Sequence, residues 1–180
     1  MKEGRVAAYA FTDATGGPGY WRDVGTVEAF WHAHMELLLP EPPLELYDPA
    51  WPIITLPEQL PPARLLYAAG RHGFVANSLL AGGVVVKGAT VTNSVLAGNV
   101  QVSEGTLLDE SVVLPGARIG ANCKLRRVII DEGVEIPDGT SVGWQPVSPL
   151  ETVRTGTCIT LISRDWVPPA PFDDEIRSVA

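Results

Sequence analysis

An apolar residue recurs through the middle of the chain at a repeating interval of five, six and six positions. Four such cycles follow one another without a break, and each cycle closes after 17 residues. This length exceeds one helical or strand period, but it suits one turn of a triangular coil in which three short strands each point one side chain inward. Hexapeptide-type repetition of this kind is typical of a parallel β-helix. The thirteen positions are Phe74, Leu79, Val85, Val91, Leu96, Val102, Leu108, Val113, Ile119, Leu125, Ile130, Ile136 and Val142.

The residues between these positions agree with a stack of coils. Glycines cluster there, and tight corners often need the positive φ that glycine adopts without steric cost. Most of the recurring residues are leucine or β-branched, as strands prefer. We therefore predict a mainly β protein in which residues 74–142 form about four coils of a parallel β-helix. Its left-handed sense is taken from resemblance to known hexapeptide proteins, since spacing alone does not fix handedness.

The segments on either side of the repeat are predicted as follows. Residues 1–39 contain a strand over Val6–Phe11, a glycine-rich loop, and a helix that begins after Thr26, a suitable N-cap. We expect the apolar face of this helix to need a partner layer that this chain does not supply. Residues 40–73 are a proline-rich, packed connector that runs into a strand near Leu66. Residues 143–167 form a C-terminal cap with a last strand at Leu161 and Ile162, and residues 168–180 form a disordered tail.

Composition excludes several classes of function. The formal net charge of −8 and the pI near 4.8 argue against nucleic-acid binding, which requires clustered Lys and Arg. The sequence has no apolar run of membrane-spanning length and no secretory signal at its start. Cys123 and Cys158 lie far from any metal-ligand spacing, and Cys123 is predicted to be a small buried residue. We expect a cytoplasmic protein.

Two enzyme classes that use hexapeptide solenoids depend on histidines. Many of these solenoids are acyltransferases with a histidine on a coil, and a related carbonic anhydrase class holds a metal with three histidines at coil edges. This chain has no histidine within residues 74–142, and His32, His34 and His72 all precede the repeat. His32 and His34 are two positions apart on the predicted helix and point to different faces. The sequence therefore disfavours both classes.

The loop before the helix offers one candidate metal ligand. Asp23 lies between Arg22 and Gly25, just ahead of the helix N-terminus, where a carboxylate can face phosphates and a divalent cation. Mg²⁺ prefers one or two such oxygens together with substrate phosphates. From spacing alone, a cap or a solvated side chain explains Asp23 better.

Three stretches of sequence resemble one family. GYWRDVGTVEAFWHAHMELL (residues 19–38), LYDPAWPIITLPEQLPPARLL (residues 46–66) and SVVLPGARIGANCKLRRVIIDEGVEIPDGTSVG (residues 111–143) are similar to the C-terminal part of bacterial glucose-1-phosphate adenylyltransferases. The resemblance implies a left-handed β-helix preceded by the last strand, loop and helix of an α/β nucleotidyltransferase domain. It also implies a homo-oligomer, tetrameric in the family, and the synthesis of ADP-glucose from ATP and glucose 1-phosphate for glycogen.

The resemblance assigns roles to individual residues. Asp23 matches one of two family aspartates that hold Mg²⁺, and Trp21 and Arg22 match the wall of the sugar-phosphate pocket. Arg164 and Arg154 match arginines of a sugar-phosphate effector site. Two further effector arginines are replaced by Glu132 and Pro168, which puts the site or its specificity in question.

Two hypotheses of different classes follow. In the first, the chain is the C-terminal assembly and regulatory portion of such an enzyme, cut from a longer protein or truncated in its gene, and inactive alone because the nucleotide-binding loop is missing. In the second, it is a non-catalytic subunit that pairs with a full-length homologue and binds a phosphorylated effector. An unclassified acyltransferase is disfavoured by the missing coil histidine.

Overall fold

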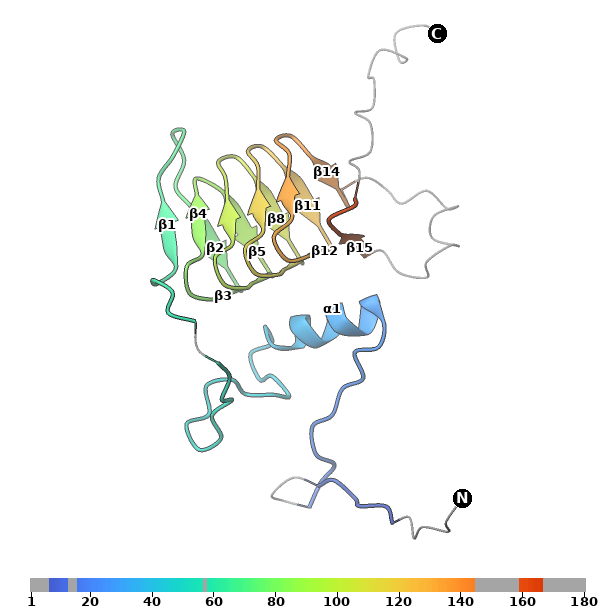
Figure 1. Ribbon diagram of the computed structural model, residues 1–180. Coiled ribbons are helices and arrows are strands. Elements are labelled where there is room, and N and C mark those ends of the chain that lie inside the picture. Colours follow the sequence, from blue (N-terminus) through green and yellow to red (C-terminus); the bar gives the residue numbers. More distant parts are fainter. Residues whose placement is uncertain (1–6, 13–15, 57, 145–158, 167–180) are drawn as a thin grey trace, which may run out of the picture.

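A computed structural model describes residues 7–12, 16–56, 58–144 and 159–166. In this part of the chain, three parallel sheets of five strands each wind into a β-solenoid, and one short helix lies beside it (Figure 1). The first face contains β1 (Arg64–Leu66), β4 (Val85–Lys87), β7 (Gln101–Val102), β10 (Arg118–Ile119) and β13 (Glu135–Ile136). The second contains β2 (Phe74–Ala76), β5 (Thr90–Thr92), β8 (Leu107–Asp109), β11 (Lys124–Arg126) and β14 (Ser141–Val142). The third contains β3 (Leu79–Leu80), β6 (Val95–Leu96), β9 (Val112–Val113), β12 (Val128–Ile130) and β15 (Thr160–Ile162).

The five strands on each face make about five turns, one more than predicted. β1 confirms the strand predicted near Leu66 at the end of the connector, but it also pairs with β4, with Leu65 opposite Val86. The ladder of strands therefore begins before residue 74. At the other end, β15 pairs with β12 and confirms the last strand predicted at Leu161 and Ile162.

The register of the first turn differs from the prediction. Phe74 is 55% exposed, and Leu79 and Val85 are only half-buried; the inward residues there are Val75, Leu80 and Val86. The cause is a shorter corner: Val86 and Val91 are five positions apart, whereas Val102 and Leu108 are six apart. From Val91 to Ile136, all nine predicted residues are at most 3% exposed and fill the interior. Val142 packs against this core from a half-buried position.

One corner of the solenoid is built from residues in the left-handed backbone region. Asn77, Asn93, Glu110 and Arg127 have φ between 44° and 52° at equivalent positions just before the strands of the third face. Gly143 continues the series at φ 79°, and a Cβ there would overlap the carbonyl oxygen of Arg126. Glycine is therefore required at that position by both conformation and space.

A column of serines lies immediately after this corner. Ser94 and Ser111 are completely buried. Each hydroxyl donates to a carbonyl of its own turn, Ser94 to Thr92 O at 2.6 Å and Ser111 to Asp109 O at 2.6 Å. Each also accepts a backbone N–H from the next turn: Ser111 N reaches Ser94 Oγ at 3.1 Å, and Val128 N reaches Ser111 Oγ at 3.3 Å. The column thus satisfies amides that the strand ladders leave unpaired.

The N-terminal part agrees with the prediction in its helix but not in its first strand. Helix α1 (Val27–Glu36) follows Thr26, whose Oγ1 accepts from Ala29 N at 3.1 Å, which confirms the predicted cap. The strand expected over Val6–Phe11 is wrong for residues 7–11, which lie outside regular structure. Among the residues that the structure describes, no helix combines the length and the apolar character needed to span a membrane. Cys123 is fully buried, as expected.

Candidate functional site

The loop that precedes α1 is extended and exposed. Trp21 is 70% exposed. One oxygen of Asp23, Oδ1, accepts a hydrogen bond from Gly25 N at 2.9 Å, which forms a local turn ahead of the helix. This turn directs the carboxylate back toward the chain just before the helix N-terminus, and it accounts for part of the carboxylate's hydrogen bonding without any metal.

Arg22 is held by the far end of the same helix. Its Nε donates to Glu36 Oε2 at 2.7 Å and its Nη2 donates to Glu36 Oε1 at 3.0 Å, so the pair is bidentate. The hydrogen bond from Arg22 lowers the pKa of the Glu36 carboxyl, and the same bond raises the pKa of Arg22. The Tyr20 ring lies 5.3 Å from the guanidinium carbon. The loop is therefore tied to the C-terminal end of α1 as well as to its start.

A complete metal site does not form from the described residues. No group of three or more His, Cys, Asp or Glu side chains gathers among them. His32 and His34 lie on different faces of α1, as predicted: His32 approaches Glu28 at 3.8 Å, whereas His34 Nδ1 lies 2.8 Å from Phe30 O. Asp23 is thus a single carboxylate, and the residues described here fit at most one part of a magnesium site.

Arg164 lies in a pocket at the C-terminal end of the solenoid. The pocket has a volume of about 340 Å³ and is lined by Gly133, Val134, Glu135, Pro137, Ser163, Arg164 and Trp166. Arg164 Nε donates to Glu132 O at 3.2 Å, which orients the guanidinium. Glu132, which stands where an effector arginine was expected, is exposed and contributes this carbonyl. Arg154 and Pro168 lie outside the described residues.

Helix α1 packs on the third face of the solenoid. Trp31 is 8% exposed and forms a cluster with Val112 of β9 and Ile129 of β12, and Phe30, Met35, Leu114 and Ile159 pack against that cluster. Trp31 Nε1 donates to Glu110 O at 2.8 Å. The expectation that this chain supplies no partner layer for the helix is therefore wrong, because the outward side chains of its own solenoid supply one.

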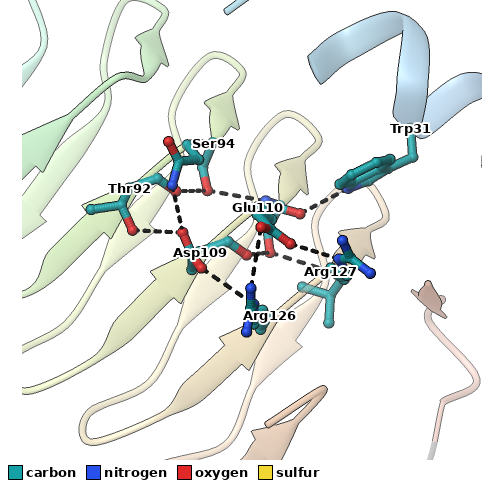
Figure 2. Close-up of polar contacts among 10 residues, drawn as sticks. Trp31, Thr92, Ser94, Asp109, Glu110, Arg126 and Arg127 are labelled. Carbon is teal, nitrogen blue, oxygen red and sulfur yellow. Dashed lines mark hydrogen bonds and ion pairs between the residues drawn. The ribbon is translucent and has the colours of Figure 1, made fainter. Parts of the chain in front are cut away.

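An ion network surrounds this contact, as Figure 2 shows. Arg127 Nε donates to Glu110 Oε2 at 2.6 Å, and Arg126 Nη2 donates to Glu110 Oε1 at 3.2 Å. Arg126 Nε, which is buried without a hydrogen bond, forms an ion pair with Asp109 Oδ2 at 3.3 Å. The guanidinium carbon of Arg127 also lies 5.8 Å from the Trp31 ring centroid. We call Trp31, Glu110, Arg127 and Ile129 the helix junction.

Sequence reasoning missed the helix junction, although a signal for it exists. Every strand of the third face from β3 to β12 carries two adjacent apolar residues, as in Val95–Leu96 and Val112–Val113. On the first face the outward neighbour is usually polar, as in Gln101–Val102. Consecutive apolar residues indicate a strand that is buried on both sides.

Comparison with known proteins agrees with this fold. The GlmU-like, C-terminal hexapeptide family matches residues 61–162, more than half of the chain. Glucose-1-phosphate adenylyltransferase 2 of Pseudoalteromonas atlantica is 46% identical over 144 residues, which are 79% of this chain and 34% of the relative. The glucose-1-phosphate adenylyltransferase of Thiobacillus denitrificans is 46% identical over 82% of this chain and 34% of its own length.

A further relative extends the match. The glucose-1-phosphate adenylyltransferase of Nitrosospira multiformis is 43% identical over 169 residues, 91% of this chain and 40% of the relative. The chain therefore spans between a third and two fifths of the length of these curated relatives. The family resemblance predicted from the sequence is confirmed: the chain belongs to the GlmU-like, C-terminal hexapeptide family, and it is similar to about a third of a glucose-1-phosphate adenylyltransferase.

Proposed function

We propose that this chain is the assembly and effector-binding portion of a glucose-1-phosphate adenylyltransferase, which joins ATP and glucose 1-phosphate to give ADP-glucose and diphosphate. The observation that carries the proposal is the match that covers 91% of the chain. Fewer than 20 of the 180 residues remain uncovered, so the match includes the Asp23 loop together with the solenoid. The alternative of a non-catalytic subunit is not favoured, because these relatives are named as the enzyme itself.

Within that proposal, Asp23 supplies one carboxylate to Mg²⁺, and Trp21 and Arg22 line the sugar-phosphate pocket. A bound Mg²⁺ would neutralise charge on the phosphate oxygens during transfer. Asp23 Oδ1 is engaged by Gly25 N, which leaves Oδ2 for a cation. Because one carboxylate and one ion-paired arginine do not position a nucleotide, we expect no turnover from this chain alone.

The pocket that contains Arg164 is our candidate effector site. A guanidinium on the wall of a pocket of about 340 Å³, beside the ring of Trp166, suits a phosphorylated sugar. The carboxylate of Glu135 on the same wall repels further anionic groups, and Arg118, which lies 4.0 Å from that carboxylate, offsets part of the repulsion.

We propose a cytoplasmic homo-oligomer as the working assembly, in keeping with the exposed Trp51, Ile54 and Leu56 of the connector.

A chimaeric enzyme tests the catalytic part of the proposal. The chain is joined to the remaining part of the Thiobacillus denitrificans relative, and ADP-glucose formation from ATP and glucose 1-phosphate is measured. We expect activity in the chimaera, none in the chain alone, and a loss of about 100-fold or more for Asp23→Asn. Asp48→Asn is the matched control, because Asp48 Oδ1 accepts from Ala50 N at 2.8 Å in the same kind of turn.

The outcomes of this experiment are distinct. Equal activity losses for Asp23→Asn and Asp48→Asn would reduce Asp23 to a turn residue. A folded but inactive chimaera would contradict the proposed function. For the effector site, Arg164→Gln should abolish the response to a sugar phosphate, whereas Arg64→Gln on β1, at the opposite end of the solenoid, should preserve it.

A further inference from the structure

Among the strands that the structure describes, β15 lies at the edge of the third face, and it leads directly into the Arg164 pocket. Within these strands its one neighbour is β12, with Thr160 opposite Val128 and Ile162 opposite Ile130. Ile162 is fully buried in the core, whereas Leu161 is 47% exposed. Ser163 and Arg164, which line the pocket, follow the strand without an intervening residue. The position of Arg164 therefore depends on how firmly β15 is held.

Helix α1 contributes to holding this strand. Ile159, the residue before β15, packs against the cluster that Trp31 forms with Val112 and Ile129. Arg127 connects the same two elements: its carbonyl accepts from Thr160 N at 3.0 Å, while its guanidinium lies against the Trp31 ring. Trp31, which docks the helix, is thus in contact with Arg127, whose carbonyl accepts the hydrogen bond from the first residue of β15.

Helix α1 and strand β15 depend on each other for their stability. A ten-residue helix is marginal on its own in water, so the helical state of α1 rests on the junction. An edge strand of three residues likewise needs packing beyond its single ladder. If docking of α1 stabilises β15, then any ligand that requires β15 in place must stabilise docked α1 by the same coupling free energy.

We propose that Trp31 is a positioning residue for Arg164: by docking α1 on the third face, it holds β15 in the sheet and keeps Arg164 at its pocket. The consequence of this docking for ligand binding rests on the proposed function above. The docking of α1 on the third face is independent of that function, because it can be measured without a ligand. The same junction links the Asp23 loop, which precedes α1, to the Arg164 pocket.

Hydrogen exchange on the whole chain tests the proposal. In Trp31→Leu, we expect the amides of residues 159–162 to exchange about tenfold faster than in the wild type. The amides of Leu107–Asp109 in the middle of the second face should be unchanged, which shows that the solenoid is still folded. Trp51→Leu is the matched control, because Trp51 is 73% exposed. Trp31→Phe keeps an aromatic ring in the cluster but loses the hydrogen bond to Glu110 O and part of the packing area, so it should recover more of the protection than Trp31→Leu.

The result that would overturn the proposal is specific. If α1 amides exchange faster in Trp31→Leu while residues 159–162 keep their wild-type rate, Trp31 docks the helix without positioning the strand. A second arm titrates inorganic phosphate and follows the α1 amides. We expect slower exchange in the wild type and in Arg64→Gln, and no effect in Arg164→Gln.

The exchange measurement without ligand and the phosphate titration test the role of Trp31 and the effector site separately. Equal phosphate affinity in Trp31→Leu and the wild type would also refute a positioning role for Trp31. If phosphate does not bind any variant, the effector site of the proposed function fails, and the exchange rates of residues 159–162 still decide the role of Trp31.

Discussion

The serine column offers the sharpest test of how the turns are held together. Ser111 is fully buried, and its hydroxyl both donates to Asp109 O and accepts from Val128 N. Ser111→Ala removes both bonds. Asp109 O keeps a second donor, Arg127 N at 3.2 Å, but Val128 N–H loses its acceptor inside the core.

The expected loss of folding free energy follows from the unpaired amide of Val128. A buried donor left without a partner costs about 1–3 kcal/mol, so we take about 2 kcal/mol for Ser111→Ala. With a urea dependence of about 2 kcal/mol per molar, the unfolding midpoint should fall by about 1 M. Urea unfolding followed by far-UV circular dichroism measures this shift, and the slope of the transition should stay unchanged.

The control is another serine of the solenoid. Ser141 on β14 is exposed, so Ser141→Ala should change the free energy of unfolding by less than about 0.5 kcal/mol. Ser94→Ala should resemble Ser111→Ala, because Ser94 Oγ accepts from the buried amide of Ser111. A midpoint for Ser111→Ala no lower than that of Ser141→Ala would refute the view that the hydroxyls satisfy the corner amides.

Three further predictions concern the corners, the thiol and the loop. Gly143→Ala should lower the unfolding midpoint clearly more than Gly139→Ala, because both have positive φ but only a Cβ at Gly143 meets the carbonyl of Arg126; equal shifts would contradict this. Burial raises the pKa of the Cys123 thiol, so the unfolded state loses its proton first and stability should fall as the pH rises above about 8.5, a loss that Cys123→Ala should reduce. Arg22→Gln should raise the depressed pKa of the Glu36 carboxyl in an NMR titration; an unchanged pKa would disprove the ion pair.

The sequence predicted the solenoid well where its turns are regular. From Val91 onward the five-six-six spacing identified the inward residues, because each side of a 17-residue turn must place one side chain in the interior. The prediction failed in the first turn, where the corner around Gly88 is one residue shorter and each inward position moves by one. Phe74 looked like a core residue only because the interval was extended across that corner.

The ends of the ladder were harder to predict for a different reason. The strand predicted near Leu66 is β1, but its place in the solenoid was not predicted, because β1 follows two prolines and has no glycine-marked corner before it. Its pairing with β4 depends on a neighbour about 20 positions away, which no local pattern reports. The roles of Asp23 and Arg164 could not be predicted from neighbouring residues either. Asp23 lies in one local turn and Arg164 on one pocket wall, and their roles were assigned from resemblance to a family.

The contrast between inward and outward side chains explains where function can reside in such a chain. The inward column is determined by the geometry of a triangular turn, and it would look the same in a solenoid with any role. That geometry does not determine the outward side chains, and here they and one corner carry the apolar surface under Trp31, the Glu110–Arg127 ion pair and the start of the β12–β15 ladder. Because the helix that follows Asp23 and the strand that precedes Arg164 both rest on this surface, the proposed role of Trp31 predicts that a ligand bound at Arg164 also stabilises the docked helix.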